Sequence, residues 1–306
     1  MKRLPFLKPG SKVAIAAPAR WVKPEEVAFG IRWLETCGFV PVVDERLYAQ
    51  HHIFAGDDRN RAEVIQQYLD DNAIEAIWLA RGGYGSIRIL DRLDFTRFLS
   101  CPKWMVGFSD ATVFHGKLSR LGMPSLHAPM PYGFESKTVE ARQSLFDALT
   151  GRPLHHEFPS HPFNHEGEAE AEIVGGNLSV LCGMMGSDSF PETDGKILFI
   201  EEVDEYIYHI DRMMHALKRA GILENLKGLI MGGLTQIHDN ADPFGMTVEE
   251  VIADAVKNYA YPVCFGFPAG HCADNRALVL GWTMAMKIQP LSSTLIQADG
   301  QIQLTS

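Results

Sequence analysis

The sequence predicts an α/β protein of two domains, and three observations support this prediction. Apolar runs of strand length alternate with segments of helical spacing through residues 12–151. A segment rich in proline and histidine, residues 151–170, then interrupts the alternation. The chain of 306 residues is also about twice as long as a common domain. We therefore expect an N-terminal α/β domain over residues 1–150, a linker over 151–170 and a C-terminal α/β domain over 171–306.

The N-terminal domain is expected to contain a doubly wound parallel sheet. Strands joined by short helical connections favour parallel pairing, and ligands of such sheets lie beyond the carboxyl ends of the strands. Pro24 near the start and Gly38 at the end mark the limits of the first helix. The expected strands are 12–19, 39–43, 73–80 and 103–109, and the expected helices are 23–38, 58–72, 85–94, 110–122 and 138–151.

The C-terminal domain is expected to mix helices with strands. Its apolar runs indicate strands, and two segments of amphipathic spacing indicate helices. The tail, residues 276–306, has the pattern of β-structure with hairpin turns, one of them at ADGQ, residues 298–301. Before the tail, the expected strands are 196–202, 226–234 and 261–267, and the expected helices are 208–221 and 246–259.

Composition narrows the class of protein. The formal net charge of −10 argues against a non-specific nucleic-acid binder, which needs an excess of Lys and Arg to displace counterions. No apolar run reaches the roughly 18 residues of a membrane span. The five cysteines form no CxxC pair, which is typical of reduced thiols in a reducing compartment. We therefore expect a cytoplasmic enzyme that binds neither nucleic acid nor a membrane.

Ser109 follows an apolar strand and precedes a helix, in the sequence GFSDA at 107–111. A strand-to-helix turn flanked by small residues exposes its central side chain and leaves free N–H groups at the start of the helix. These donors and the helix dipole suit a developing oxyanion. A helix N-cap is the alternative explanation for a serine here, and GFSDA lacks the final glycine of the G-x-S-x-G pattern.

A glycine-rich loop follows another expected strand. ARGGYGS, residues 80–86, lies at the carboxyl edge of the sheet, where its backbone amides can approach a ligand. Such a loop can supply a second oxyanion donor, cradle a phosphate or form only a turn. Neither GxxxxGK[ST] nor GxGxxG is present, which weakens the phosphate interpretation. No cofactor is therefore expected.

Four acidic residues surround the end of the strand at 196–202. Asp204 and Glu205 suit the positive end of the helix that follows. Glu201 and Glu202 lie too near the strand for that explanation to be complete. Period-two alternation sends these two side chains to opposite faces, so only one of them can face a shared site. The sequence alone does not say which.

His271 lies in a loop of Gly, Pro and Ala after the strand expected at 261–267. A histidine at this edge is placed to act as a base near neutral pH, and a solvated loop histidine is the alternative. Four other histidines match no zinc spacing, so no metal site is expected from them: His155, His156, His161 and His165.

One serine, one acid cluster and one histidine, all at strand ends and in the order Ser–Glu–His, favour a hydrolase. The motifs around them resemble those of the LD-carboxypeptidase family, the serine peptidases that include the microcin-immunity peptidases. They span most of the chain in the order of the family. The matching motifs are RGGYGS (81–86), GFSDAT (107–112), GGNLSVL (175–181), ILFIEEVDEYIYHIDRMMHAL (197–217) and GFPAGH (266–271).

The resemblance implies a role for each candidate residue. Ser109 would be the nucleophile, His271 the general base and Glu201 its orienting partner. The backbone amides of Asp110 and Gly83 would form the oxyanion hole. The resemblance also implies an N-terminal domain like that of the class I glutamine amidotransferases. A distinctive C-terminal α/β domain would follow it, with the site in the crevice between the two.

The implied reaction is hydrolysis of an L,D amide bond at the C-terminus of a cytoplasmic muropeptide, which releases D-alanine from a tetrapeptide during cell-wall recycling. The terminal carboxylate of such a substrate needs a partner, and Arg81 and Arg212 are the candidate cations. Because Ser109 lies in one expected domain and Glu201 and His271 lie in the other, the angle between the domains is expected to control activity.

Two other functions remain open at this point. A peptidase of the microcin-immunity type would cleave peptidyl or aminoacyl nucleotides, and an aromatic wall for the adenine would favour it. A protein of another class, without catalysis, would close its two domains on a small peptide. A homodimer is the expected assembly, although no residue pattern fixes the oligomeric state.

Overall fold

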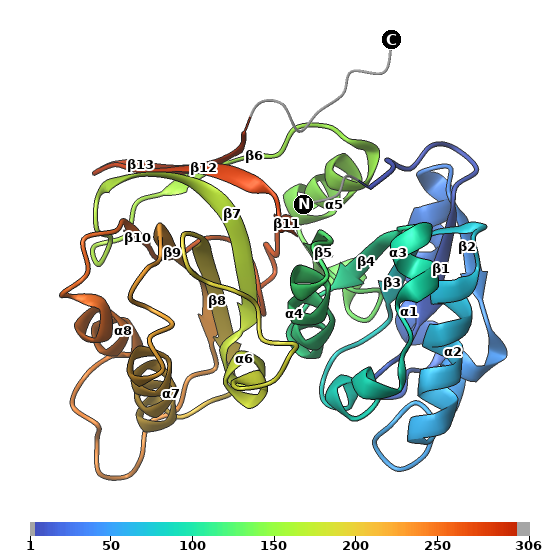
Figure 1. The fold of residues 1–306 in the computed structure, drawn as a ribbon, viewed down its shortest axis with the longest axis horizontal. Coiled ribbons are helices and arrows are strands. Elements are labelled where there is room, and N and C mark those ends of the chain that lie inside the picture. The colour runs from blue at the N-terminus through green and yellow to red at the C-terminus, as the bar shows by residue number, and fades with distance from the viewer. Residues whose placement is uncertain (1–3, 299–306) are drawn as a thin grey trace.

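The computed structural model describes residues 4–298, which form two β-sheets lying side by side (Figure 1). One sheet has six strands in the order β11-β5-β4-β3-β1-β2, and the other has seven in the order β10-β9-β8-β7-β12-β13-β6. Helices cover both sheets. The predicted α/β class and the predicted parallel sheet of the first half are therefore confirmed.

In the first sheet, β1 to β5 run parallel, and β11 pairs with β5 in the antiparallel direction. Its central strands β3 and β4 are buried along almost their whole length because helices cover both of their faces. The three-residue strand β5 was not predicted, since so short a run carries no readable period. The strands are β1 (Lys12–Ala16), β2 (Val40–Val43), β3 (Ile74–Leu79), β4 (Trp104–Gly107), β5 (Ser125–His127) and β11 (Leu278–Leu280).

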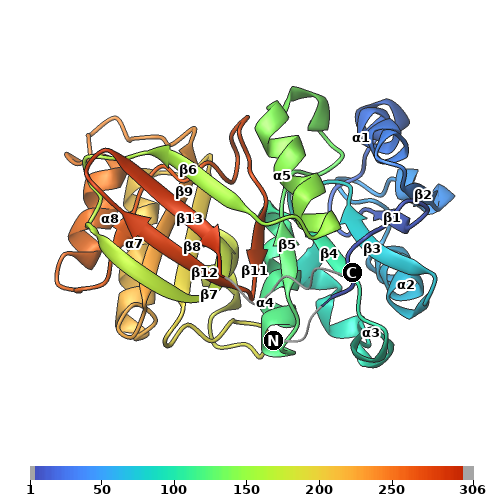
Figure 2. The ribbon, with the colours of Figure 1, turned by 90° about the horizontal axis from the view of Figure 1, so that it is seen from above.

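Figure 2 shows helices α1 and α5 on one side of the first sheet and α2 and α3 on the other. The helix expected at 85–94 is instead two 3₁₀ turns, Ser86–Arg88 and Leu90–Arg92. Ile89 ends one turn and begins the other, so the chain bends where an α-helix would run straight. The helices are α1 (Pro24–Thr36), α2 (Asp58–Asp70), α3 (Thr96–Ser100), α4 (Thr112–Arg120) and α5 (Val139–Thr150).

The second sheet is parallel from β10 to β7 and antiparallel from β7 to β6. The second half thus combines strands and helices as predicted. Of the turn expected at 298–301, residues 299–301 lie outside the described residues. The strands are β6 (His155–Pro159), β7 (Gly167–Asn177), β8 (Ile197–Val203), β9 (Gly228–Thr235), β10 (Val263–Cys264), β12 (Thr283–Ile288) and β13 (Ser292–Gln297), and the helices are α6 (Leu178–Met184), α7 (Ile207–Arg219) and α8 (Val248–Val256).

Residues 151–170 do not form a linker throughout, which corrects that expectation. They contain β6 and the first residues of β7. In β6 burial alternates, and His156 and Phe158 face the interior. Because histidines and prolines occupy several positions of this segment, the alternation of apolar and polar residues that indicates a strand cannot be recognised in its sequence.

The two halves of the chain are joined by more than the connection at 151–170. β11 comes from the second half but forms the edge of the first sheet, where Figure 2 places it between the halves. One hydrophobic core extends from the first sheet into the second, and α4 packs against β7. A second core lies beneath α7 and α8. Within residues 4–298, no helix has both the length and the apolar character needed to cross a membrane.

Candidate active site

Ser109 occupies a strained turn at the carboxyl end of β4. Its φ is +64°, a left-handed conformation that is uncommon outside glycine, and such strain is a feature of functional sites. The turn continues into a short 3₁₀ segment and then α4. No side-chain cap bond starts either helix. The N-cap explanation therefore does not hold, and the Ser109 hydroxyl is free to bond elsewhere.

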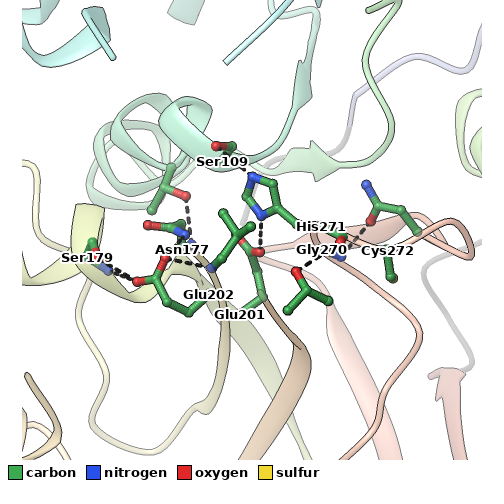
Figure 3. A network of polar contacts seen from close by, with 12 residues as sticks. Ser109, Asn177, Ser179, Glu201, Glu202, Gly270, His271 and Cys272 are labelled. Atoms are coloured by element: carbon green, nitrogen blue, oxygen red, sulfur yellow. Dashed lines mark hydrogen bonds and ion pairs between the residues drawn. The ribbon is translucent and has the colours of Figure 1, made fainter. Parts of the chain in front are cut away.

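The Ser109 hydroxyl bonds to an imidazole from the other half of the chain (Figure 3). His271 Nε2 lies 3.1 Å from Ser109 Oγ, and His271 Nδ1 lies 2.6 Å from Glu201 Oε2. A carboxylate only accepts, so Nδ1 carries a proton, and in the neutral ring Nε2 accepts from the hydroxyl. Serine, histidine and glutamate thus form one hydrogen-bonded chain.

Glycine 270 permits the contact between His271 and Glu201. Its φ is +107°, and a Cβ at this position would lie 2.7 Å from Glu201 Oε2 and 2.8 Å from Glu201 Cβ. The loop that carries His271 runs from β10 to β11, whereas Glu201 stands near the end of β8. The close approach of loop and strand therefore depends on the absence of a side chain at residue 270.

Glu201 is the acid that faces the site, and Glu202 points away from it, as the alternation requires. Glu201 is fully buried, and within residues 4–298 its Oε1 has no hydrogen-bond partner. Glu202 is also buried but accepts hydrogen bonds from Asn177 Nδ2 at 2.8 Å, the Ser179 N–H at 2.8 Å and the Val203 N–H at 2.9 Å. Glu202 thereby secures the start of α6, while Glu201 is directed at His271.

The glycine loop, which we define as residues 82–86, lies against the nucleophile turn. A Cβ at Gly82 would lie 3.0 Å from Ser109 Cβ, so the loop approaches as closely as glycine allows. The Ser86 N–H donates to Asp110 Oδ2 at 2.8 Å. Burial raises the pKa of Asp110. The residue after Ser109 therefore fastens the loop whose Gly83 amide was expected in the oxyanion hole.

Lys137 from the first half holds the His271 loop, and no sequence pattern predicts this role. Its Nζ donates to Cys272 O at 2.6 Å and lies 5.9 Å from the centre of the Phe108 ring. Burial lowers the pKa of Lys137. The Thr138 N–H donates to Ala273 O at 3.2 Å. The start of α5 thus supports the loop of the catalytic candidate from the opposite half.

The two candidate arginines lie in different surroundings. Arg81 directly precedes the glycine loop, its guanidinium lies 3.9 Å from the centre of the Tyr132 ring, and it donates to Trp21 O at 3.3 Å. Arg212 is exposed on α7, with its guanidinium 5.3 Å from the Tyr208 ring centre. Arg81 is therefore the candidate held next to the glycine loop.

Among the described residues, no group of three His, Cys, Asp or Glu side chains is arranged to hold a metal ion. The histidines of 151–170 have packing roles where their contacts are defined. His156 is buried and donates from Nε2 to Ala277 O at 3.0 Å. Burial lowers its pKa to about 4. The ring of His161 stacks on Phe265.

A serine hydroxyl, an imidazole and a buried carboxylate are hydrogen-bonded in this order at the edge of an α/β sheet. This arrangement is typical of the class of serine hydrolases. Two domain families match this chain: the LD-carboxypeptidase N-terminal domain over residues 13–128 and the LD-carboxypeptidase C-terminal domain over residues 170–286. The chain belongs to the LD-carboxypeptidase family, a family of serine carboxypeptidases.

Individual relatives support this membership. The chain is 30% identical to a probable murein peptide carboxypeptidase of Bacillus subtilis (strain 168), over 92% of this chain and 90% of the relative. It is 25% identical to the microcin C7 self-immunity protein MccF of Escherichia coli, over 89% and 88%. The crystal structure of muramoyltetrapeptide carboxypeptidase from Oxalobacter formigenes superposes with a TM-score of 0.86 at 27% identity, covering 94% of this chain and 99% of that one.

Proposed function

We propose that this protein is a serine LD-carboxypeptidase that hydrolyses the L,D amide bond at the C-terminus of a muropeptide and releases D-alanine from a tetrapeptide. The observation that carries the proposal is the hydrogen-bonded chain from Ser109 through His271 to the buried Glu201. The names of two similar proteins, a probable murein peptide carboxypeptidase and a muramoyltetrapeptide carboxypeptidase, support the substrate class.

In the acylation step, His271 Nε2 takes the proton of Ser109 Oγ as the oxygen attacks the scissile carbonyl. The imidazolium then gives this proton to the departing amino group of D-alanine. In the second step a water attacks the acyl-serine ester, and His271 again moves the proton, from the water to Ser109. Both steps pass through a tetrahedral oxyanion, for which we assign the N–H groups of Gly83 and Asp110 as donors.

Glu201 favours the charged state of His271 that exists only during these steps. Its carboxylate is buried, and its hydrogen bond within residues 4–298 goes to Nδ1. A buried carboxylate is costly without a countercharge, and the imidazolium supplies one. The interaction is therefore stronger in the transition state than in the resting enzyme, which is the condition for catalysis.

We assign the terminal carboxylate of the substrate to Arg81. The contact with Tyr132 and the bond to Trp21 O hold the guanidinium beside the glycine loop. A guanidinium that is already ordered loses little entropy when it binds a carboxylate in a bidentate manner. Arg212, whose guanidinium lies over Tyr208, is the second candidate for this role.

Release of D-alanine from a muropeptide tetrapeptide tests the proposal. Ser109→Ala is expected to lower kcat by at least about 10⁴-fold, because removal of a triad nucleophile leaves only binding and oxyanion stabilisation. Ser136→Ala is the control, since this serine is exposed and its hydroxyl bonds, among the described residues, to the nearby Gly133 O. Retention of most turnover by Ser109→Ala, with an unchanged circular dichroism spectrum, would refute the assignment.

A second candidate function is cleavage of peptidyl or aminoacyl nucleotides. The observation that favours it is the exposed ring of Tyr84 in the glycine loop, 6.1 Å from the ring of Phe54, because such rings can stack on a base. Parallel assays with the tetrapeptide and an aminoacyl sulfamoyl or phosphoramidate nucleotide separate the two. A preference for the nucleotide in kcat/KM would replace the muropeptide proposal.

We further propose that the protein works in the cytoplasm as a homodimer. The five cysteines are all unpaired, including the buried Cys264, which fits a reducing compartment. Light scattering coupled to size-exclusion chromatography tests the assembly: a mass near twice 34.1 kDa supports the dimer, and a mass near 34.1 kDa refutes it.

A further inference from the structure

A buried arginine lies behind the glycine loop and outside the triad. Arg61 belongs to α2, and its side chain has no exposed surface. Its Nη1 donates to Gly85 O at 2.9 Å and also to Pro18 O, and its Nη2 donates to Asp58 Oδ1. Burying a guanidinium is costly unless its N–H groups find acceptors, and here two of them are loop carbonyls. One side chain thus connects α2 with the loops after β1 and β3.

The peptide group between Gly85 and Ser86 is held from both sides. Its carbonyl accepts from Arg61, and its N–H donates to Asp110 Oδ2 at 2.8 Å. Both side chains are buried, and Asp110 directly follows Ser109. The end of the glycine loop is therefore fixed relative to the nucleophile by a guanidinium on one side and a carboxyl group on the other.

The glycine loop needs such an anchor because its own backbone is permissive. Gly83 has a φ of +102° and Gly85 a φ of +142°, both in the region where glycine lacks the restraint of a side chain. An unanchored loop of this kind samples many conformations, and each would place the Gly83 amide differently. A donor stabilises an oxyanion most when it is already in place.

We infer that Arg61 is a positioning residue that fixes the glycine loop, and with it the Gly83 amide, at the place where the oxyanion of the reaction forms. The inference rests on the proposed function, in which this amide is an oxyanion donor. Within the described residues, no hydrogen bond joins Arg61 to Ser109 or to His271. It acts through the Gly85 carbonyl.

Arg88 offers a matched control. It donates to the same carboxylate, with Nε 2.9 Å from Asp58 Oδ1 and Nη2 2.8 Å from Asp58 Oδ2. It also lies over the same Phe54 ring, at 5.5 Å against 4.6 Å for Arg61. Its side chain is 45% exposed, and within residues 4–298 its guanidinium makes no hydrogen bond to a loop carbonyl. Arg88→Met therefore removes the same charge and the same carboxylate contact without releasing Gly85.

The experiment measures two quantities in Arg61→Met, Arg61→Lys and Arg88→Met. The first is kcat and KM for D-alanine release, and the second is the rate at which a fluorophosphonate labels Ser109. We expect Arg61→Met to lower kcat about 10- to 100-fold, with KM within about twofold, because a misplaced catalytic group costs on this order. The labelling rate should fall in parallel. Arg61→Lys should recover part of both, and Arg88→Met should stay within about twofold of the wild type.

Several results would overturn the inference. They are a kcat for Arg61→Met within about twofold of the wild type, an equal loss in Arg88→Met, or a loss carried by KM. If Arg61→Met does not fold, wild-type kcat and labelling in Arg61→Lys overturn it instead. A wild-type protein that is labelled but does not cleave the tetrapeptide refutes the proposed substrate, and the labelling rates then still test Arg61. A wild type that does neither overturns both.

Discussion

The two sides of the site are built by different means. On the nucleophile side, backbone conformation does most of the positioning: Ser109 is held at φ +64°, and Gly83 in the adjacent glycine loop at +102°. On the base side, side chains do it: the buried Glu201 orients His271, and the partly buried Lys137 holds the loop that follows. The first side depends on a local turn, whereas the second depends on contacts between segments far apart in the chain.

This difference determines how each side of the site should respond to substitution. Strain in a turn is maintained by the fold around it, so single substitutions there change the position of donors by small amounts. A buried carboxylate with one partner has no substitute, so its loss removes the orientation and the countercharge of His271 together. The base side should therefore be the more sensitive to conservative change.

Among substitutions on the base side, Glu201→Gln should have the largest effect, a fall in kcat of about 10³- to 10⁴-fold, because an amide can hold the imidazole in the wrong tautomer. Glu202→Gln is its neighbour-matched control. It weakens the bonds from Asn177 and Ser179 and should cost about 1–3 kcal/mol of unfolding free energy while leaving kcat within about threefold. Steady-state kinetics and urea unfolding of both variants measure this. Equal losses of kcat would show that the two acids are not distinguished by the faces they occupy.

The sequence predicted the nucleophile side better than the base side, because the first depends on a local turn and the second on contacts between distant segments. GFSDA and RGGYGS are local patterns whose turn chemistry can be read directly. Alternation placed Glu201 and Glu202 on opposite faces, but which face meets His271 depends on how the second sheet docks on the first. The resemblance to the family chose Glu201, and the 2.6 Å contact agrees with that choice.

Other features could not be read because they arise only on folding. Arg61 looks like one more charged residue on an amphipathic helix, and its buried contacts involve loops 24 and 43 residues away in the chain. Lys137 bonds across 135 residues. β11 joins the first sheet although its sequence belongs to the second half. No periodicity records such pairings.

Gly270→Ala should have the next largest effect, a fall in kcat of about 100-fold, because the added Cβ would meet Glu201 Oε2 at 2.7 Å and displace the His271 loop. Gly245→Ala is the control: this glycine also has a positive φ, +86°, but an added Cβ would have nothing within 4 Å. Both variants should lose similar stability from backbone strain. If kinetics and thermal melting show equal loss of kcat in both, the close approach at Gly270 is not what matters.

Lys137→Met should have a smaller effect, about a tenfold fall in kcat, since Thr138 still holds the same loop through Ala273 O. Lys117→Met is the matched control, because Lys117 also joins the two halves of the chain, through Asp188 at 2.7 Å, but away from His271. Steady-state kinetics separate the two. A loss of kcat in Lys117→Met as large as in Lys137→Met would assign the effect to the attachment of the halves and not to support of the loop.

The smallest effect should be on stability alone, and it compares a histidine from each half. Burial lowers the pKa of His115 and of His156 to about 4, from a usual value of 6.5. Between pH 6.5 and 4 the unfolded chain therefore binds more protons than the folded one. The contribution of each histidine to stability is thus fully present above pH 6.5 and is lost as the pH falls. Each histidine should lower the free energy of unfolding by about 2 kcal/mol when the pH falls from 7.5 to 5.

Urea unfolding of the wild type, His115→Gln and His156→Gln at the two pH values tests this. Each variant should lose about 2 kcal/mol less than the wild type on acidification, because glutamine does not titrate. Since one hydrophobic core extends through both sheets, both variants should unfold in a single transition. Two transitions, with only one of them shifted by each variant, would show that the halves are separately stable. The contacts between the nucleophile side and the base side would then be too weak to make the two halves unfold together.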